Sequence, residues 1–160
     1  MKKILALLLM LAMSVALFTG CGSDPVYDDL ENFLNVEMTE VNANYTKIKE
    51  EVSKWTTYED DAAILNSLNE VLLPLVDGSI AALEGINPAT EEVKTVKDKY
   101  VKVMDAYKEG FGNLAKGAES QVEETINAGY EKISEAVELL EEYNKALEEL
   151  AAEHGSEIEY

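Results

Sequence analysis

The amino-acid sequence predicts an all-α protein, an antiparallel up-down-up-down four-helix bundle behind a cleaved N-terminal leader. Two observations predict this class. From residue 24 onward, apolar side chains recur every three or four residues along four segments, which is the spacing of one helix face and not of a strand. The segments are also of similar length, roughly 45 Å each at 1.5 Å per residue. Very short turns separate them, and short turns favour antiparallel neighbours.

The first 21 residues have the form of a secretory signal peptide. The chain starts with two lysines after Met1, residues 4–18 are apolar apart from Ser14, and small residues precede Cys21, the single cysteine. This order is typical of a leader that is cleaved on export. With a cysteine directly after the cut, the segment resembles the lipobox of bacterial lipoproteins, in which that cysteine is lipidated. Phe18 stands where the lipobox usually has leucine.

The resemblance to a bacterial lipoprotein implies a lipid anchor on Cys21, in the cell membrane and facing outside the cytoplasm. Two acyl chains hold a protein stably at a membrane, so Cys21 is expected to be an anchor and not a catalytic thiol. The alternative interpretation is an uncleaved membrane helix, because residues 4–21 reach the lower length limit for spanning a bilayer. The predicted organisation is therefore a signal peptide at 1–20, a lipidated tether at 21–25, the helical bundle at 26–153 and an acidic tail at 154–160.

Local signals set the expected helix limits. Asp24 suits an N-cap and Pro25 the first turn, while capping-box patterns at Thr56, Thr57 and Ser120 predict two further helix starts. The expected helices cover residues 24–55, 57–84, 87–116 and 120–153.

Two glycines bear on where these helices end. Gly85 is expected to end the second helix in a left-handed conformation, and Asn87-Pro88 to start the third. The apolar spacing stays in phase across Gly117. Because of that continuity, the last two segments are also open to interpretation as one long bent helix.

Composition and charge exclude several classes of protein. An apolar fraction of 47% excludes a disordered chain, and one cysteine excludes an intrachain disulfide framework. Cleavage after Gly20 removes Lys2 and Lys3, which leaves 11 lysines against 32 acidic residues and a net charge of −21. Because the chain has no arginine and this charge is strongly negative, nucleic acid is excluded as a partner.

An acidic face is expected on the fourth helix. It is interpreted as a solvated surface, with a loose divalent-cation surface as the alternative, since no calcium-binding loop is present. The carboxylates concerned are Glu131, Glu135, Glu138, Glu142 and Glu149.

The sequence offers little for catalysis or for a cofactor. His154, the single histidine, stands in the tail with no nucleophile near it in sequence. The Glu-x-x-His pairs of di-iron bundles are missing. We therefore expect no enzyme, no cofactor and no structural metal.

Two features of the helices are open to more than one interpretation. The second helix is apolar on more than one face, so Val71, Leu73, Pro74 and Val76 either lie deep in the core or form a partner or cavity surface. Pro74 is expected to kink this helix. Six tyrosines lie on or beside the apolar faces, either as core residues or as the lining of a cavity: Tyr27, Tyr45, Tyr100, Tyr107, Tyr130 and Tyr143.

The leading functional hypothesis is a lipid-anchored, extracytoplasmic helical module with a binding, interaction or structural role in the bacterial cell envelope. Its expected partners are the membrane, through the lipid on Cys21, and an envelope protein or a second copy, through the second helix. The alternative is a small-molecule-binding or sensor lipoprotein with a cavity between helices. A carboxylate-based hydrolase is the third hypothesis and the least supported, because one histidine leaves little to build with.

Overall fold

The computed structural model describes residues 15–17 and 24–159. Within these ranges the chain is predominantly helical, which confirms the predicted all-α class. Most of the predicted signal peptide, the cleavage site and Cys21 lie outside the described residues. In the described part, no helix combines the length and apolar character needed to cross a membrane.

Eight helical segments form four rods in the part of the chain that the structure describes. Two short π-helical segments, η1 and η2, continue the helices on either side of them, so each joins two α-helices into one rod. In chain order the segments are α2 (Pro25–Asn32), η1 (Phe33–Glu37), α3 (Thr39–Lys54), α4 (Asp61–Ser67), η2 (Leu68–Leu72), α5 (Leu73–Gly85), α6 (Glu91–Ser120) and α7 (Glu123–Glu153).

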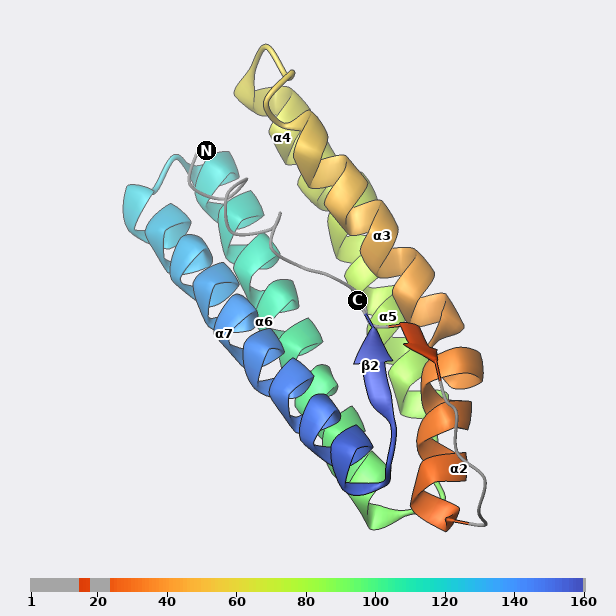
Figure 1. The fold of residues 1–160 in the computed structure, drawn as a ribbon. Coiled ribbons are helices and arrows are strands. Elements are labelled where there is room, and N and C mark those ends of the chain that lie inside the picture. Colours follow the sequence, from red (N-terminus) through yellow and green to blue (C-terminus); the bar gives the residue numbers. More distant parts are fainter. Residues whose placement is uncertain (1–14, 18–23, 160) are drawn as a thin grey trace.

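The rods are arranged as two helical pairs (Figure 1). α3 packs beside α5, α6 packs along the length of α7, and α5 contacts α6 to join the pairs. The apolar faces meet in one core, whose largest fully buried side chains include Tyr45, Leu72, Tyr107 and Ile133. The spacing of apolar residues therefore predicted the buried faces, whereas the closed four-helix bundle stays a prediction.

The last two helices are separate. α6 ends at Ser120, and Gln121 adopts a left-handed conformation with φ of 56°. The N–H of Val122 then donates to the carbonyl of Gly117, which closes the last turn of α6. This break excludes one continuous bent helix.

Three of the expected capping signals do not act as predicted. The hydroxyls of Thr56, Thr57 and Ser120 donate to backbone carbonyls three or four residues earlier, and so bond to the ends of the preceding helices. The second rod is capped instead by Asp60, whose carboxylate accepts from the N–H of Ala63 at 2.9 Å.

Asp24 caps α2 as predicted. Its Oδ1 accepts from the N–H of Val26 at 3.0 Å and from that of Tyr27 at 3.4 Å. Its Oδ2 lies 2.7 Å from Nδ1 of His154, just beyond α7. The pKa of Asp24 is lowered, chiefly by this contact with His154. The single histidine therefore joins the start of the first rod to the end of the last one.

Pro74 lies in a helix that has adapted to it. Directly before α5, η2 replaces the α-helical pattern by wider π turns, and the N–H of Leu73 donates to the carbonyl of Leu68, five residues earlier. Proline provides no N–H for the backbone hydrogen bonds of a helix, and a π segment changes the pattern of these bonds directly before it. The second rod therefore continues through Pro74 into α5.

The predicted acidic tail is packed against the end of α7. Gly155 takes a left-handed conformation with φ of 75°, Ser156 is buried, and β2 (Glu157–Glu159) pairs antiparallel with β1 (Val15–Leu17). The periodicity of the sequence does not predict these strands. Cleavage after residue 20 would remove β1 and leave β2 without this partner.

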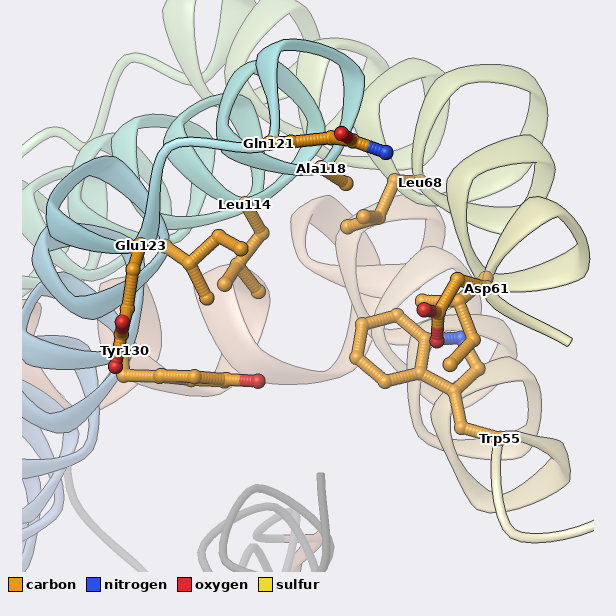
Figure 2. Close-up of a pocket in the computed structure, with 10 residues that line it drawn as sticks. Trp55, Asp61, Leu68, Leu114, Ala118, Gln121, Glu123 and Tyr130 are labelled. Carbon is orange, nitrogen blue, oxygen red and sulfur yellow. The ribbon is translucent and has the colours of Figure 1, made fainter.

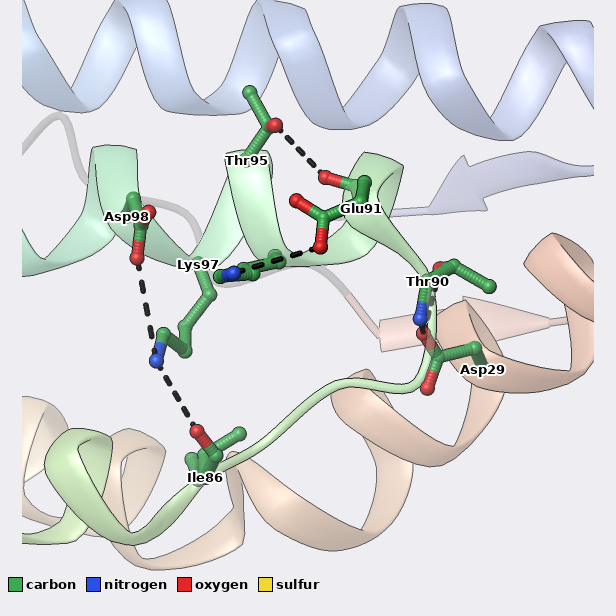
Figure 3. A network of polar contacts seen from close by, with 8 residues as sticks. Asp29, Ile86, Thr90, Glu91, Thr95, Lys97 and Asp98 are labelled. Atoms are coloured by element: carbon green, nitrogen blue, oxygen red, sulfur yellow. Dashed lines mark hydrogen bonds and ion pairs between the residues drawn. The ribbon is translucent and has the colours of Figure 1, made fainter.

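α6 begins later than expected, and a distant carboxylate binds the backbone directly before it. Gly85 is not left-handed, and the chain runs on through Ile86 in an extended conformation. α6 starts at Glu91, where Asp29 of α2 accepts from the N–H groups of Ala89 at 3.0 Å and Thr90 at 2.8 Å (Figure 3). The hydroxyl of Thr90 donates to the same carboxylate at 2.6 Å.

This contact predicts a pH-dependent contribution to stability. Burial raises the pKa of Asp29, but the bonds from Thr90 and Ala89 outweigh it, so the pKa lies below its ordinary value of 3.8. A lowered folded-state pKa stabilises the fold above the unfolded-state pKa, and this stabilisation is lost as the pH falls through the folded-state value.

Asp29→Asn should therefore lower the free energy of unfolding at neutral pH by about 1–3 kcal/mol, because its NH₂ group cannot accept from backbone donors. Denaturant titrations should show this difference shrinking below about pH 4. Glu31→Gln is the control, since Glu31 is exposed on the same helix. An equal loss of stability in both variants would contradict the role given to Asp29 at the start of α6.

Candidate functional site

A cavity of about 450 Å³ lies between the two helical pairs, at the end of the molecule that carries the α3–α4 and α6–α7 turns. Its volume falls in the range of small-molecule sites. The lining is mostly apolar or aromatic: Trp55, Asp61, Ile64, Leu68, Leu114, Ala118, Gln121, Glu123, Ile126 and Tyr130.

Two aromatic side chains from opposite pairs define the cavity. Trp55 follows α3, and Tyr130 comes from the second turn of α7. Figure 2 shows the hydroxyl of Tyr130 pointing across the cavity toward the indole of Trp55. Leu68 and Leu114, both buried, lie between them. The cavity therefore exists only where the first and second rods meet the third and fourth.

A buried polar cluster holds Trp55 in place. The indole Nε1 donates to Oγ of Ser67 at 2.8 Å. On the preceding turn of α3, the carboxylate of Glu51 accepts from the hydroxyl of Tyr58 at 2.6 Å and from Nζ of Lys54 at 2.9 Å. The bond to Ser67 fixes the orientation of the indole at the wall of the cavity.

The charged groups at the cavity are carboxylates. Asp61 and Glu123 are exposed and mark its opening. The pKa of Tyr130 is raised, first by burial and second by the negative charge of Asp61. The cavity therefore combines a largely apolar interior with a negative opening.

Gln121 adds an unusual backbone to the same opening. It is the one non-glycine residue with positive φ in the described part of the chain, and it lines the cavity. A left-handed conformation costs a non-glycine residue roughly 1–2 kcal/mol. Such strain is found more often at functional sites than elsewhere.

The apolar residues singled out on the second rod lie away from this cavity. Val76 is fully buried in the core, so it cannot belong to an exposed partner surface. Val71 and Leu73 are partly buried and Pro74 is exposed. Val71 and Pro74 instead line a second hollow, of about 390 Å³, between α3 and α5.

The six tyrosines divide between core and cavity. Tyr130 lines the cavity, whereas the other five are buried in the core. The rings of Tyr100 and Tyr143 pack at a centroid distance of 4.8 Å. The hydroxyls of Tyr45 and Tyr107 are buried with no hydrogen-bond partner among the described residues. Burial raises the pKa of both groups, which therefore stay neutral.

Most cavity residues were not predicted as site residues. Trp55, Leu68 and Leu114 belong to the apolar faces and read as core positions. Asp61 and Glu123 read as first-turn acids of two helices. One signal was available, because the single tryptophan stands at the end of a helix, beside a turn. The acidic face of α7 is exposed, as predicted, and none of its five glutamates lines the cavity.

Comparison with known proteins gives one finding. A family model described as uncharacterised lipoprotein PM1805 matches residues 27–155. The match starts beyond Cys21, so it supports a lipoprotein independently of the leader sequence. No curated protein and no solved structure matches the chain.

Proposed function

The chain belongs to the uncharacterised lipoprotein PM1805 family, and we propose that its mature part is a small-molecule-binding module of the bacterial cell envelope. In this proposal the lipid on Cys21 holds the domain outside the cytoplasmic membrane. The four rods form an up-down-up-down bundle, and the ligand binds in the cavity beside Trp55. The role is binding and not catalysis.

The cavity is the observation that supports this role. Its volume of about 450 Å³ suits a ligand of drug-like size, and its walls come from all four rods. Trp55 is held rigidly by Ser67, and a preformed wall lowers the entropy cost of binding. His154 lies with Asp24 at the other end of the rods and takes no part. Five of the eight residues that line the hollow beside Pro74 are charged, which favours the cavity as the ligand site.

Anchoring can be tested on Cys21 directly. We expect the protein to take up labelled fatty acid in cells, and Cys21→Ala to abolish the label and leave an unprocessed precursor. Ser14→Ala, a change inside the leader that leaves the cysteine intact, should remain labelled. A wild-type chain that still begins at Met1 and carries no label would contradict the anchor.

Ligand binding can be tested by filling the cavity. The purified, processed protein should retain small molecules from an envelope extract, identified by mass spectrometry. Ala118→Phe places a ring in the cavity and should abolish this retention. Ala43→Phe makes the same change at an exposed site on α3 and should leave it intact. Equal retention by both variants would locate binding elsewhere.

A further inference from the structure

We propose that the cavity beside Trp55 selects a small organic cation, an ammonium group carried on an apolar or aromatic body. This inference rests on the proposed ligand site and names the chemistry of its ligand. It follows from the nature of the walls, from the charge at the opening and from the charge of the surrounding turns.

The walls provide two aromatic surfaces for a cation. Trp55 and Tyr130 lie on opposite sides of the cavity, with the hydroxyl of Tyr130 toward the indole (Figure 2). The face of an aromatic ring attracts an ammonium group, tryptophan most strongly. Because Trp55 is 6% exposed and its Nε1 is already bonded to Ser67, the ring surface is what it offers to a ligand. Leu68 and Leu114 suit the apolar body of the same molecule.

The opening provides the countercharge. Asp61 and Glu123 are the carboxylates of the lining, and no lysine is among the described residues that line the cavity. The lysine nearest in sequence to Trp55 is Lys54, and Glu51 already holds it at 2.9 Å. A bound anion would therefore meet two carboxylates without a cation to offset them, whereas a bound ammonium would be neutralised.

The surrounding turns extend the negative field. The α3–α4 turn carries Glu59 and Asp60 before Asp61. The last turn of α6 carries Glu119, and the first turn of α7 carries Glu123 and Glu124. Clefts lined by one sign of charge raise the local concentration of the opposite ion. Helix dipoles do not reverse this field, because each turn joins the negative end of one helix to the positive start of the next. The formal charges therefore decide the preference.

The test uses the intrinsic fluorescence of Trp55, the single tryptophan of the chain. The processed protein in uncharged maltoside micelles is titrated with three probes of similar size: benzyltrimethylammonium, its neutral carbon isostere neopentylbenzene, and benzenesulfonate. We expect the cation to bind at least about tenfold more tightly than the neutral probe. The anion should not bind, and the cation's affinity should fall as salt increases.

Charge variants identify the groups responsible. The double variant Asp61→Asn, Glu123→Gln should weaken the cation about tenfold and leave the neutral probe unchanged. Glu138→Gln, an exposed carboxylate on α7 outside the lining, is the control and should leave the affinity for the cation unchanged. Tyr130→Leu should weaken the cation more than the neutral probe, because it removes a ring and keeps apolar volume.

The outcomes separate this inference from the proposed function. If the neutral probe binds as tightly as the cation, or the anion binds, the cation preference is overturned while the cavity remains a ligand site. Both the cation preference and the proposed function are overturned if two results occur together. None of the three probes changes the fluorescence of Trp55, and neither does any extract component whose retention Ala118→Phe abolishes. Phosphatidylethanolamine added to the micelles separates two sources of the same ammonium chemistry. Competition with the probe would indicate a lipid headgroup, and lack of competition a free cation.

Discussion

Leu72→Ala should lower the free energy of unfolding by about 2–5 kcal/mol. Leu72 is fully buried where η2 meets α5, so removing its side chain loses the transfer free energy of burial and leaves a cavity that the core cannot fully close. Leu140→Ala, in the buried face of α7, should have a loss in the same range. Urea titrations of the processed protein would measure both.

An exposed apolar residue gives the control for these truncations. Val36 is 64% exposed on η1, and Val36→Ala should change the free energy of unfolding by no more than about 0.5 kcal/mol. If Leu72→Ala and Leu140→Ala were as mild as Val36→Ala, the apolar faces of the second and fourth rods would not be buried as described. A loss at only one of the two would locate the discrepancy in that rod.

Gly129→Ala should disrupt the contact between α6 and α7. A Cβ at Gly129 would lie 2.8 Å from Cγ of Leu114 and 2.9 Å from the carbonyl oxygen of Gly110, which is backbone and cannot move aside. α6 and α7 would have to separate, at a cost of about 1–3 kcal/mol. Because their contact is the most extensive in the fold, the loss should appear in thermal unfolding of the whole domain.

Gly112→Ala is the matched control, with an effect of opposite sign. A Cβ at Gly112 has nothing within 4 Å of it, and alanine is the better helix former. Gly112→Ala should therefore raise the free energy of unfolding by about 0.5–1 kcal/mol. If Gly129→Ala also stabilised the protein, the close approach of α6 and α7 at this position would be wrong.

The sequence by itself determined the class of protein and the helices. The leader and its cysteine indicated a lipoprotein, and the family match over residues 27–155 confirms this class. A helix face has a fixed period, so the spacing of apolar residues located the four rods and their buried faces. Asp24 also capped the first helix as expected, because it bonds to backbone N–H groups within three residues.

The spacing of apolar residues could not predict helix ends that depend on residues far away in the chain. Asp29 binds Thr90, 61 residues later in the chain, at the residue that precedes α6. Thr56 and Thr57 were expected to cap the second helix, and the structure assigns that cap to Asp60. The sequence also does not predict that Gly110 is packed against α7 whereas Gly112 has open space around it.

The candidate site was decided by the tertiary structure. Trp55 and Tyr130 lie 75 residues apart in the chain, and each alone has the apolar spacing of a core residue. They face a shared cavity only because the turn after α3 and the turn after α6 end at the same level of the rods. Periodicity reports which face of a helix is buried, since that depends on near neighbours. A cavity forms where two buried helix faces do not pack closely against each other. Its position depends on contacts between rods, and no short stretch of sequence predicts those contacts.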